Sequence, residues 1–156
     1  MKVTIVSNIS ASKGRRTSRA IPSKRWIESR ASQTVRRLPA KTRCRAESVQ
    51  NLMCVFVNSA EIRRLNKKFR DKDRATDVLS FAPVEPDSLG ELVFCPQVIR
   101  KQAFEHGLSY RDELLYMLIH GILHLLGYEH EKSDKQARVM YRLQDRIFEQ
   151  LTPPHK

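Results

Sequence analysis

Residues 114–126, LLYMLIHGILHLL, place the strongest constraint on how this chain can fold. Apolar side chains occupy nearly every position, so a helix formed here is apolar almost all the way round. Ser109 followed by Asp112 forms a capping-box pattern that marks where such a helix opens. A helix of this kind belongs in the middle of a hydrophobic core. It also carries two histidines, and the fold must provide partners for both imidazoles.

Three of the five histidines lie in HGILHLLGYEH, residues 120–130. His120 and His124 are four residues apart, so their side chains project from one helical face, one turn apart. Gly127 can adopt the positive φ that reverses the chain, and the turn that follows can return His130 to the same point. Three neutral imidazoles with an open fourth position are the ligand set of a catalytic zinc site. The alternative is that they are core histidines bonded to neighbouring polar groups.

The same spacing matches the H-x-x-x-H-x-x-G-x-x-H pattern of the metzincin proteases, so we expect a metzincin-like zinc helix. Gly121 stands where those proteases carry the glutamate that acts as general base. A peptidase of that mechanism would therefore lack its proton shuttle. Glu129 could serve as a base or orient His130, and the alternative is an exposed carboxylate in a turn.

The remaining sequence alternates short apolar runs with amphipathic segments and predicts one α/β (α+β) domain over residues 1–151, followed by a tail at 152–156. Within the domain we distinguish a basic strand-loop-helix part at 1–49 from a core at 50–151 that holds the histidines. Pro39 should end the first helix. The expected strands are 2–9, 52–57, 76–81 and 91–95; a basic loop is expected at 10–19, irregular structure at 82–88, and further helices at 23–38, 60–69, 96–105 and 133–151.

The charge distribution favours a polyanionic partner, with nucleic acid ahead of an anionic membrane. The formal net charge is +12 and the pI is about 10.1. Between residues 11 and 46 there are twelve Lys and Arg and one acidic residue, Glu28, so this stretch carries most of the charge. It could be an organellar transit peptide. We favour a folded, RNA-facing part of the domain, because a strand pattern precedes it and helical periodicity follows.

The sequence predicts a soluble, cytoplasmic protein with no membrane partner. No apolar run reaches the roughly 18–20 residues of a membrane span, and the N-terminus has no secretory signal pattern. The three cysteines, Cys44, Cys54 and Cys95, are odd in number and lack C-x-x-C spacing. We expect them to be small buried or half-buried side chains in a reducing cytosol.

Three segments together resemble the YbeY family of metal-dependent endoribonucleases and ribosomal RNA maturation factors. They are LNKKFRDKDRATDVLSF at 65–81, LGELVFC at 89–95 and HGILHLLGYEH at 120–130. The resemblance covers about residues 50–150, and residues 1–49 share only the strand-then-helix layout. The family usually has aspartate where this chain has Glu129, a change that keeps the charge.

The resemblance implies an α/β sandwich with a small mixed β-sheet, one Zn²⁺ per chain held by His120, His124 and His130, and cleavage of single-stranded RNA. The implied role is maturation of the 3′ end of small-subunit (16S) ribosomal RNA and ribosome quality control. RNA and the ribosome are then the partners, with ribosomal proteins or assembly GTPases as candidate protein partners. Two alternatives remain, namely a metal-dependent peptidase and a ribosome assembly factor with a mainly structural metal and little or no nuclease activity.

A functionally important arginine of the family maps onto Arg70, so the resemblance gives catalytic roles to Arg70 and, through the metal, to His120. Independently, Arg70 follows a basic helix, and a planar guanidinium near a metal suits a bidentate grip on phosphate. The alternative is that Arg70 pairs with Asp71, Asp73 or Asp77.

Several other polar residues of the matching segments have simple structural interpretations. Thr76 and Asp77 fit turn or capping groups. His106 fits the C-terminal end of a helix. Asn66 and Tyr128 allow either a structural or a functional role.

Overall fold

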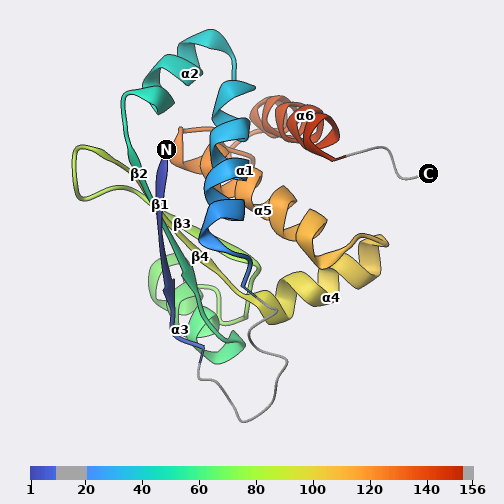
Figure 1. Cartoon of the computed structure of the whole chain (residues 1–156). Helices are drawn as coiled ribbons and strands as arrows, with labels where there is room; N and C mark the ends of the chain where they lie inside the picture. The colour runs from blue at the N-terminus through green and yellow to red at the C-terminus, as the bar shows by residue number, and fades with distance from the viewer. Residues whose placement is uncertain (10–20, 153–156) are drawn as a thin grey trace.

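The computed structural model describes residues 1–9 and 21–152, which form one α/β unit (Figure 1). Its strands and helices follow one another along the chain as β1 (Lys2–Ser7), α1 (Lys24–Arg36), α2 (Ala40–Glu47), β2 (Asn51–Phe56), α3 (Ser59–Arg70), β3 (Val78–Phe81), β4 (Ser88–Phe94), α4 (Pro96–His106), α5 (Tyr110–Leu125) and α6 (Asp134–Leu151). Among the described residues, no helix combines the length and the apolarity needed to cross a membrane.

The four strands form one mixed sheet in the order β1-β2-β4-β3. β1 and β2 run parallel, β2 and β4 run parallel, and β3 is antiparallel to β4. Parallel neighbours require crossover connections, which α1 and α2 supply between β1 and β2, and α3 and β3 supply between β2 and β4. The expected small mixed sheet is therefore confirmed.

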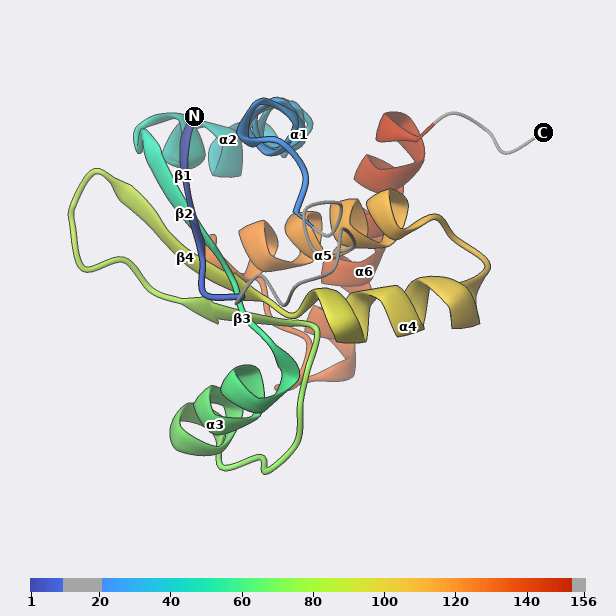
Figure 2. The same ribbon diagram turned by 60° about the horizontal axis from the view of Figure 1, so that its bottom comes forward.

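The sheet separates two cores because successive side chains of a strand point to opposite faces. Leu52, Cys54 and Phe56 of β2 belong to the larger core, with buried residues of α1, α5 and α6. Val55 and the following Val57 belong to a smaller core with residues of α3. Figure 2 shows the result, with α3 on one side of the sheet and α1, α5 and α6 on the other.

Helix α5 lies at the centre of the larger core and contacts α1, α4, α6, β3 and β4. Its N-cap, Ser109, accepts a hydrogen bond from the backbone amide of Asp112, as the capping-box pattern predicts. The prediction that this helix is a core element is confirmed by its buried positions, which are Glu113, Leu114, Leu115, Met117, Leu118, Ile119, Gly121, Ile122 and Leu123.

Helix α2 is missing from the sequence-based prediction, and the limits of the strands differ from the expected ones by one to three residues. Pro39 ends α1 as expected, but it is also the N-cap of α2, because proline is tolerated at the start of a helix. α2 buries only Ala46, so its sequence carries little helical periodicity. β4 begins at Ser88 rather than at 91, and β3 begins at Val78 rather than at 76.

The basic N-terminal part is only partly described, since the loop expected at 10–19 lies outside the described residues. Helix α1 buries Ile27, Ala31 and Val35, while Lys24 and Arg25 are exposed. The helical part of this basic segment is therefore folded onto the core with cationic side chains facing outward.

One expectation about the cysteines is wrong. Cys54 and Cys95 are buried, but Cys44 is exposed. Cys44 lies on α2, whose single buried residue is Ala46, so most of this short helix faces outward.

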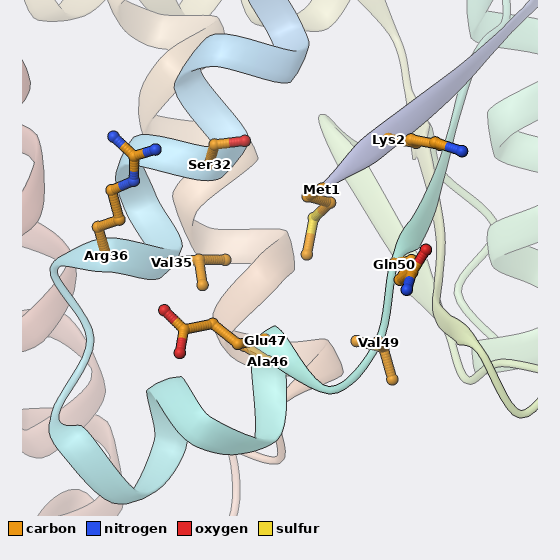
Figure 3. Close-up of a pocket in the computed structure, with 9 residues that line it drawn as sticks. All are labelled: Met1, Lys2, Ser32, Val35, Arg36, Ala46, Glu47, Val49 and Gln50. Carbon is orange, nitrogen blue, oxygen red and sulfur yellow. The ribbon is translucent and has the colours of Figure 1, made fainter.

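A hollow of about 370 Å³ lies between α1, α2 and the start of β1 (Figure 3). Val35, Ala46 and Val49 provide apolar walls, and Arg36 and Glu47 provide charged ones. None of its lining residues belongs to the cavity that contains the histidines.

Helix α5 approaches β4 closely at Gly121. A Cβ atom added at this position would lie 2.6 Å from Cδ2 and 3.0 Å from Cδ1 of Leu92. Leu92 is fully buried, so its methyl groups have little room to move. Position 121 therefore faces the sheet.

We expect Gly121→Ala to lower the free energy of unfolding by about 1–3 kcal/mol, because the added methyl group overpacks the contact with Leu92. Helix propensity alone predicts the opposite sign, a gain of roughly 0.5–1 kcal/mol. Urea denaturation followed by circular dichroism measures the difference. A higher unfolding midpoint in the variant would show that the contact is not tight.

Candidate metal centre

The C-terminal end of α5 and the turn after it bring three histidines together. His120 and His124 lie on the last two turns of α5. Beyond the helix, Gly127 has φ of +92°, and its amide donates to the His124 carbonyl at 2.9 Å. Apart from the two chain neighbours of Gly127, no atom of the described residues lies within 4 Å of the position that its Cβ would take, so glycine is favoured here for its positive φ. This reversal returns His130 to the side of the two helical histidines.

One ring nitrogen from each histidine lies within 4.8 Å of the corresponding nitrogen of the other two. The Nε2 atoms of His120 and His124 are 3.1 Å apart. The ring centroid of His130 lies 5.1 Å from that of His120 and 4.9 Å from that of His124. The three imidazoles therefore converge on one point, as the spacing of the histidines in the sequence predicts.

The other ring nitrogens of the two helical histidines define where the protons are. Nδ1 of His120 lies 2.9 Å from Oε1 of Gln144, a buried residue of α6. The amide of Gln144 is oriented by donation from its Nε2 to the Tyr116 carbonyl. Nδ1 of His124 lies 3.0 Å from the Tyr128 carbonyl. Both partner oxygens only accept, so each neutral imidazole carries its proton on Nδ1.

Both Nε2 atoms then present lone pairs to each other at 3.1 Å, and neither can donate to the other. A cation between them would satisfy both. Zn–N distances of ~2.0–2.1 Å in a tetrahedral site imply roughly 3.3 Å between ligand nitrogens, which is close to this separation. The residues present therefore fit a divalent metal ion. The simple alternative of hydrogen-bonded core histidines leaves these two lone pairs without partners.

Burial keeps the helical histidines neutral at pH 7. It lowers the pKa of His120, and it lowers the pKa of His124 to about 4, with further lowering from the neighbouring imidazoles. Because metal ions bind the neutral form, these imidazoles need no deprotonation near neutral pH.

Glu129 is half-buried, and its carboxylate forms a hydrogen bond within the turn that follows α5. Its Oε1 accepts from the backbone amide of His130 at 3.0 Å and lies 3.9 Å from Nδ1 of His124. It therefore fixes the backbone that carries His130.

Arg70, the last residue of α3, lines the same cavity as the three histidines. Its Nη2 lies 2.5 Å from Oε1 of Glu131, which also pairs with Lys72 at 3.3 Å. The hydrogen bond from Arg70 is the main cause that lowers the pKa of Glu131 to about 2.

The predicted alternative, pairing of Arg70 with Asp71, Asp73 or Asp77, is wrong. Asp73 is held by Arg63 at 2.8 Å instead. The actual partner of Arg70, Glu131, lies 61 residues away in sequence, beyond any local pattern.

The cavity around the histidines has a volume of about 860 Å³. Sequence reasoning missed several of its lining residues, among them Glu131 and Tyr141, as well as the buried Gln144. The Tyr141 ring lies 5.5 Å from that of His130. Tyr141 and Gln144 lie on α6, whose amphipathic pattern predicts a helix but carries no signal for which of its polar residues meet α5.

Four polar residues of the matching segments have structural contacts. Oδ1 of Asp77 accepts from the Val78 amide at 2.7 Å and from the Thr76 hydroxyl at 3.2 Å, as expected of a capping group. Asn66 donates to the Arg74 carbonyl at 2.9 Å. The Tyr128 hydroxyl lies 3.1 Å from that of Thr42 on α2, and this hydrogen bond connects the histidine turn to the N-terminal part of the chain.

A buried carboxylate lies at another part of the cavity. Glu113, on the first turn of α5, is fully buried, and its Oε2 lies 2.9 Å from Nδ1 of His106. This hydrogen bond raises the pKa of His106. The other oxygen, Oε1, has no hydrogen-bond partner among the described residues. His106 ends α4 as predicted, and it also pairs with the one acidic residue buried in α5.

The fold and the histidine arrangement define a class of α/β protein with a three-histidine centre at the end of a buried helix. The sequence model of the family described as Endoribonuclease YbeY matches residues 13–152. The chain belongs to this family, and the resemblance inferred from its three segments is confirmed.

Individual relatives agree with this assignment. Endoribonuclease YbeY of Bdellovibrio bacteriovorus is 46% identical over 129 residues, covering 82% of this chain and 86% of the relative. Endoribonuclease YbeY of Persephonella marina is 48% identical over 103 residues, covering 62% and 67%. The solution structure of TM1509 from Thermotoga maritima matches with a TM-score of 0.60 and 29% identity over 99% of both chains.

We expect His106→Ala to lower the free energy of unfolding by about 1–3 kcal/mol, because it leaves the buried Glu113 carboxylate without its hydrogen-bond partner. Glu105→Ala is the matched control on the same turn, since Glu105 makes an exposed pair with Lys101, and its removal should lower the free energy of unfolding by less than about 0.5 kcal/mol. Urea denaturation compares the two. Equal stability of both variants would show that the His106 contact is unimportant.

Proposed function

We propose that this protein is a zinc-dependent endoribonuclease that cleaves single-stranded RNA, with one Zn²⁺ held by His120, His124 and His130. The observation that carries the metal assignment is the pair of Nε2 lone pairs facing each other at 3.1 Å. Membership of the YbeY endoribonuclease family supports the RNA substrate. When bound, such a zinc ion supplies Lewis acidity and lowers the pKa of a water molecule to about 7.

Arg70 is the proposed phosphate-binding residue, and together with His120 it forms the catalytic pair. Its guanidinium enters the histidine cavity and can bind phosphate oxygens through two parallel hydrogen bonds. Its present partner is an exposed carboxylate, and an ion pair of this kind contributes only about 0–1 kcal/mol. An RNA phosphate can therefore replace Glu131 on Arg70 at little cost.

The RNA backbone would be drawn to this site by charge. Lys72 and Arg74 line the cavity beside Arg70, and α1 and α2 carry further exposed cations. Contacts of this type supply affinity that does not depend on base sequence and that weakens steeply with added salt.

The proposed role in the cell is maturation of the 3′ end of small-subunit (16S) ribosomal RNA and ribosome quality control in the cytoplasm. Ribosomal RNA is then the main partner, and ribosomal proteins or assembly GTPases are candidate protein partners. The peptidase alternative has no support from the geometry at position 121. A side chain there points at Leu92 in the sheet, so a glutamate at this position would not face the cavity.

We expect the purified protein to contain about one zinc ion per chain and His124→Ala to contain none, because the variant removes a ligand. The variant should also have a lower unfolding midpoint, since bound metal stabilises the folded state. Plasma mass spectrometry measures metal content.

Two variants control this measurement. His106→Gln removes a histidine of the same cavity that is not in the cluster, and it should retain zinc. Gln144→Leu removes no ligand but leaves Nδ1 of His120 unsupported, and it should weaken zinc binding by about 10- to 100-fold in a chelator competition. Unchanged zinc in His124→Ala would exclude the proposed centre.

We expect Arg70→Glu to keep its zinc but to lose about 10²- to 10³-fold in the rate of RNA cleavage, since it replaces a phosphate-binding cation with an anion. A fluorogenic single-stranded RNA measures the rate. Arg64→Glu is the matched control, because Arg64 lies on the same helix and also pairs with a glutamate, Glu61, but does not line the cavity. Equal rates for both variants would remove Arg70 from the mechanism. A zinc-loaded wild type that binds RNA without cleaving it would favour the assembly-factor alternative.

A further inference from the structure

An exposed phenylalanine stands beside Arg70 in the histidine cavity. Phe69 belongs to the same apolar row of α3 as Ile62 and Leu65, at helical spacing. Ile62 is fully buried in the smaller core, whereas Phe69 is 56% exposed. The apolar face of α3 therefore reaches beyond the core at its last turn.

The ring of Phe69 is held in place by a second aromatic ring. It meets Phe81, the last residue of β3, edge to face at 5.1 Å with an interplanar angle of 75°. Phe81 is itself half-buried, and both rings line the cavity that contains the three histidines. α3 and α5 lie on opposite sides of the sheet (Figure 2). The Phe69 side chain therefore comes from a helix on the opposite side of the sheet to the helical histidines, whereas Phe81 comes from the edge strand β3.

The two sequence neighbours of Phe69 are cationic, and one of them, Lys68, lies over its ring. The Nζ of Lys68 lies 5.2 Å from the ring centroid, and Arg70 is the next residue along the chain. An aromatic ring beside cationic side chains is the arrangement that proteins use for single-stranded nucleic acid, in which bases stack on rings and phosphates contact cations.

Of the exposed large hydrophobic residues in the described part of the chain, Phe69 and Tyr141 line the histidine cavity, and the Tyr141 ring lies beside His130 at 5.5 Å whereas Phe69 lies beside Arg70. Phe104 of α4 is 88% exposed and Val84 is 94% exposed, and neither lines the histidine cavity. Isolated apolar residues on a surface need no explanation. An exposed aromatic ring inside a polar cavity, next to the proposed phosphate site, is in a position to contact the substrate.

We propose that Phe69 is a base-stacking residue, which binds the nucleobase next to the phosphate held by Arg70. This inference rests on the proposed function and adds a determinant of substrate class. A base must be unpaired and turned out of its stack to reach the ring, so Phe69 selects single-stranded over duplex RNA. Stacking uses the π-face that every base possesses, so it imposes little sequence preference.

The test uses two fluorescein-labelled strands of equal length and charge, a ten-nucleotide oligoadenylate and a fully abasic ribose-phosphate strand. Zinc-loaded wild-type protein and Phe69→Ala are titrated with each strand, and binding is followed by fluorescence anisotropy. We expect Phe69→Ala to bind oligoadenylate about 5- to 100-fold more weakly than wild type, because one stacked base is lost. The two proteins should bind the abasic strand equally, since that strand has no base to stack.

Two further variants separate stacking from other effects. Phe69→Leu keeps an apolar side chain but no π-face, and it should bind like Phe69→Ala. Phe104→Ala removes a more exposed phenylalanine outside the cavity, and it should bind like wild type. Unchanged zinc content in each variant shows that the centre is intact.

Each other outcome overturns the inference in a recognisable way. Equal loss of affinity for both strands in Phe69→Ala would mean that the ring acts without touching a base. Unchanged affinity of this variant for oligoadenylate would exclude stacking while leaving the nuclease proposal standing. A wild-type protein that binds neither strand would overturn the proposed function and this inference together.

Discussion

Helix α5 is stable only if other elements cover nearly its whole circumference, because apolar side chains surround it. This cover comes from strands β3 and β4 of the sheet and from helices α1, α4 and α6. The two histidines, like the buried Glu113, interrupt its apolar surface, and they can be tolerated only where partners and an opening exist. The arrangement of the other elements around α5 therefore creates both the core and the edge at which the centre lies.

The same burial gives the centre its chemistry. Low polarity keeps His120 and His124 neutral, and Gln144 and the Tyr128 carbonyl hold their protons on Nδ1. The two remaining lone pairs then face one point, which is the requirement for holding a cation. A more exposed pair of histidines at the same spacing would be free to rotate, to protonate and to bind water instead.

The cavity is assembled from both sides of the sheet. α5 and the turn after it bring the imidazoles, whereas the last turn of α3 brings Phe69 and Arg70. The ion pair between Arg70 and Glu131 connects α3 to the histidine turn across a long separation in sequence. Groups proposed for metal, phosphate and base therefore come from elements whose relative position depends on the sheet between them.

The sequence by itself determined the features that depend on neighbouring residues. Most strands and helices, the cap at Ser109, the burial of α5 and the convergence of three histidines within eleven residues all follow from local periodicity, capping and one glycine turn. The family was also recognisable, because its motifs are short and contiguous. Local signals were too weak for α2, which buries a single residue.

Only the tertiary structure decided the contacts between distant segments. In it, Arg70 pairs with Glu131 rather than with a nearby aspartate. Gln144 forms a hydrogen bond with Nδ1 of His120, and His106 pairs with Glu113. The tertiary structure also left Phe69 exposed in the cavity although its helical row is otherwise core. Hydrophobic periodicity tells which face of a helix is buried, but the neighbour that it meets depends on how whole elements pack against one another.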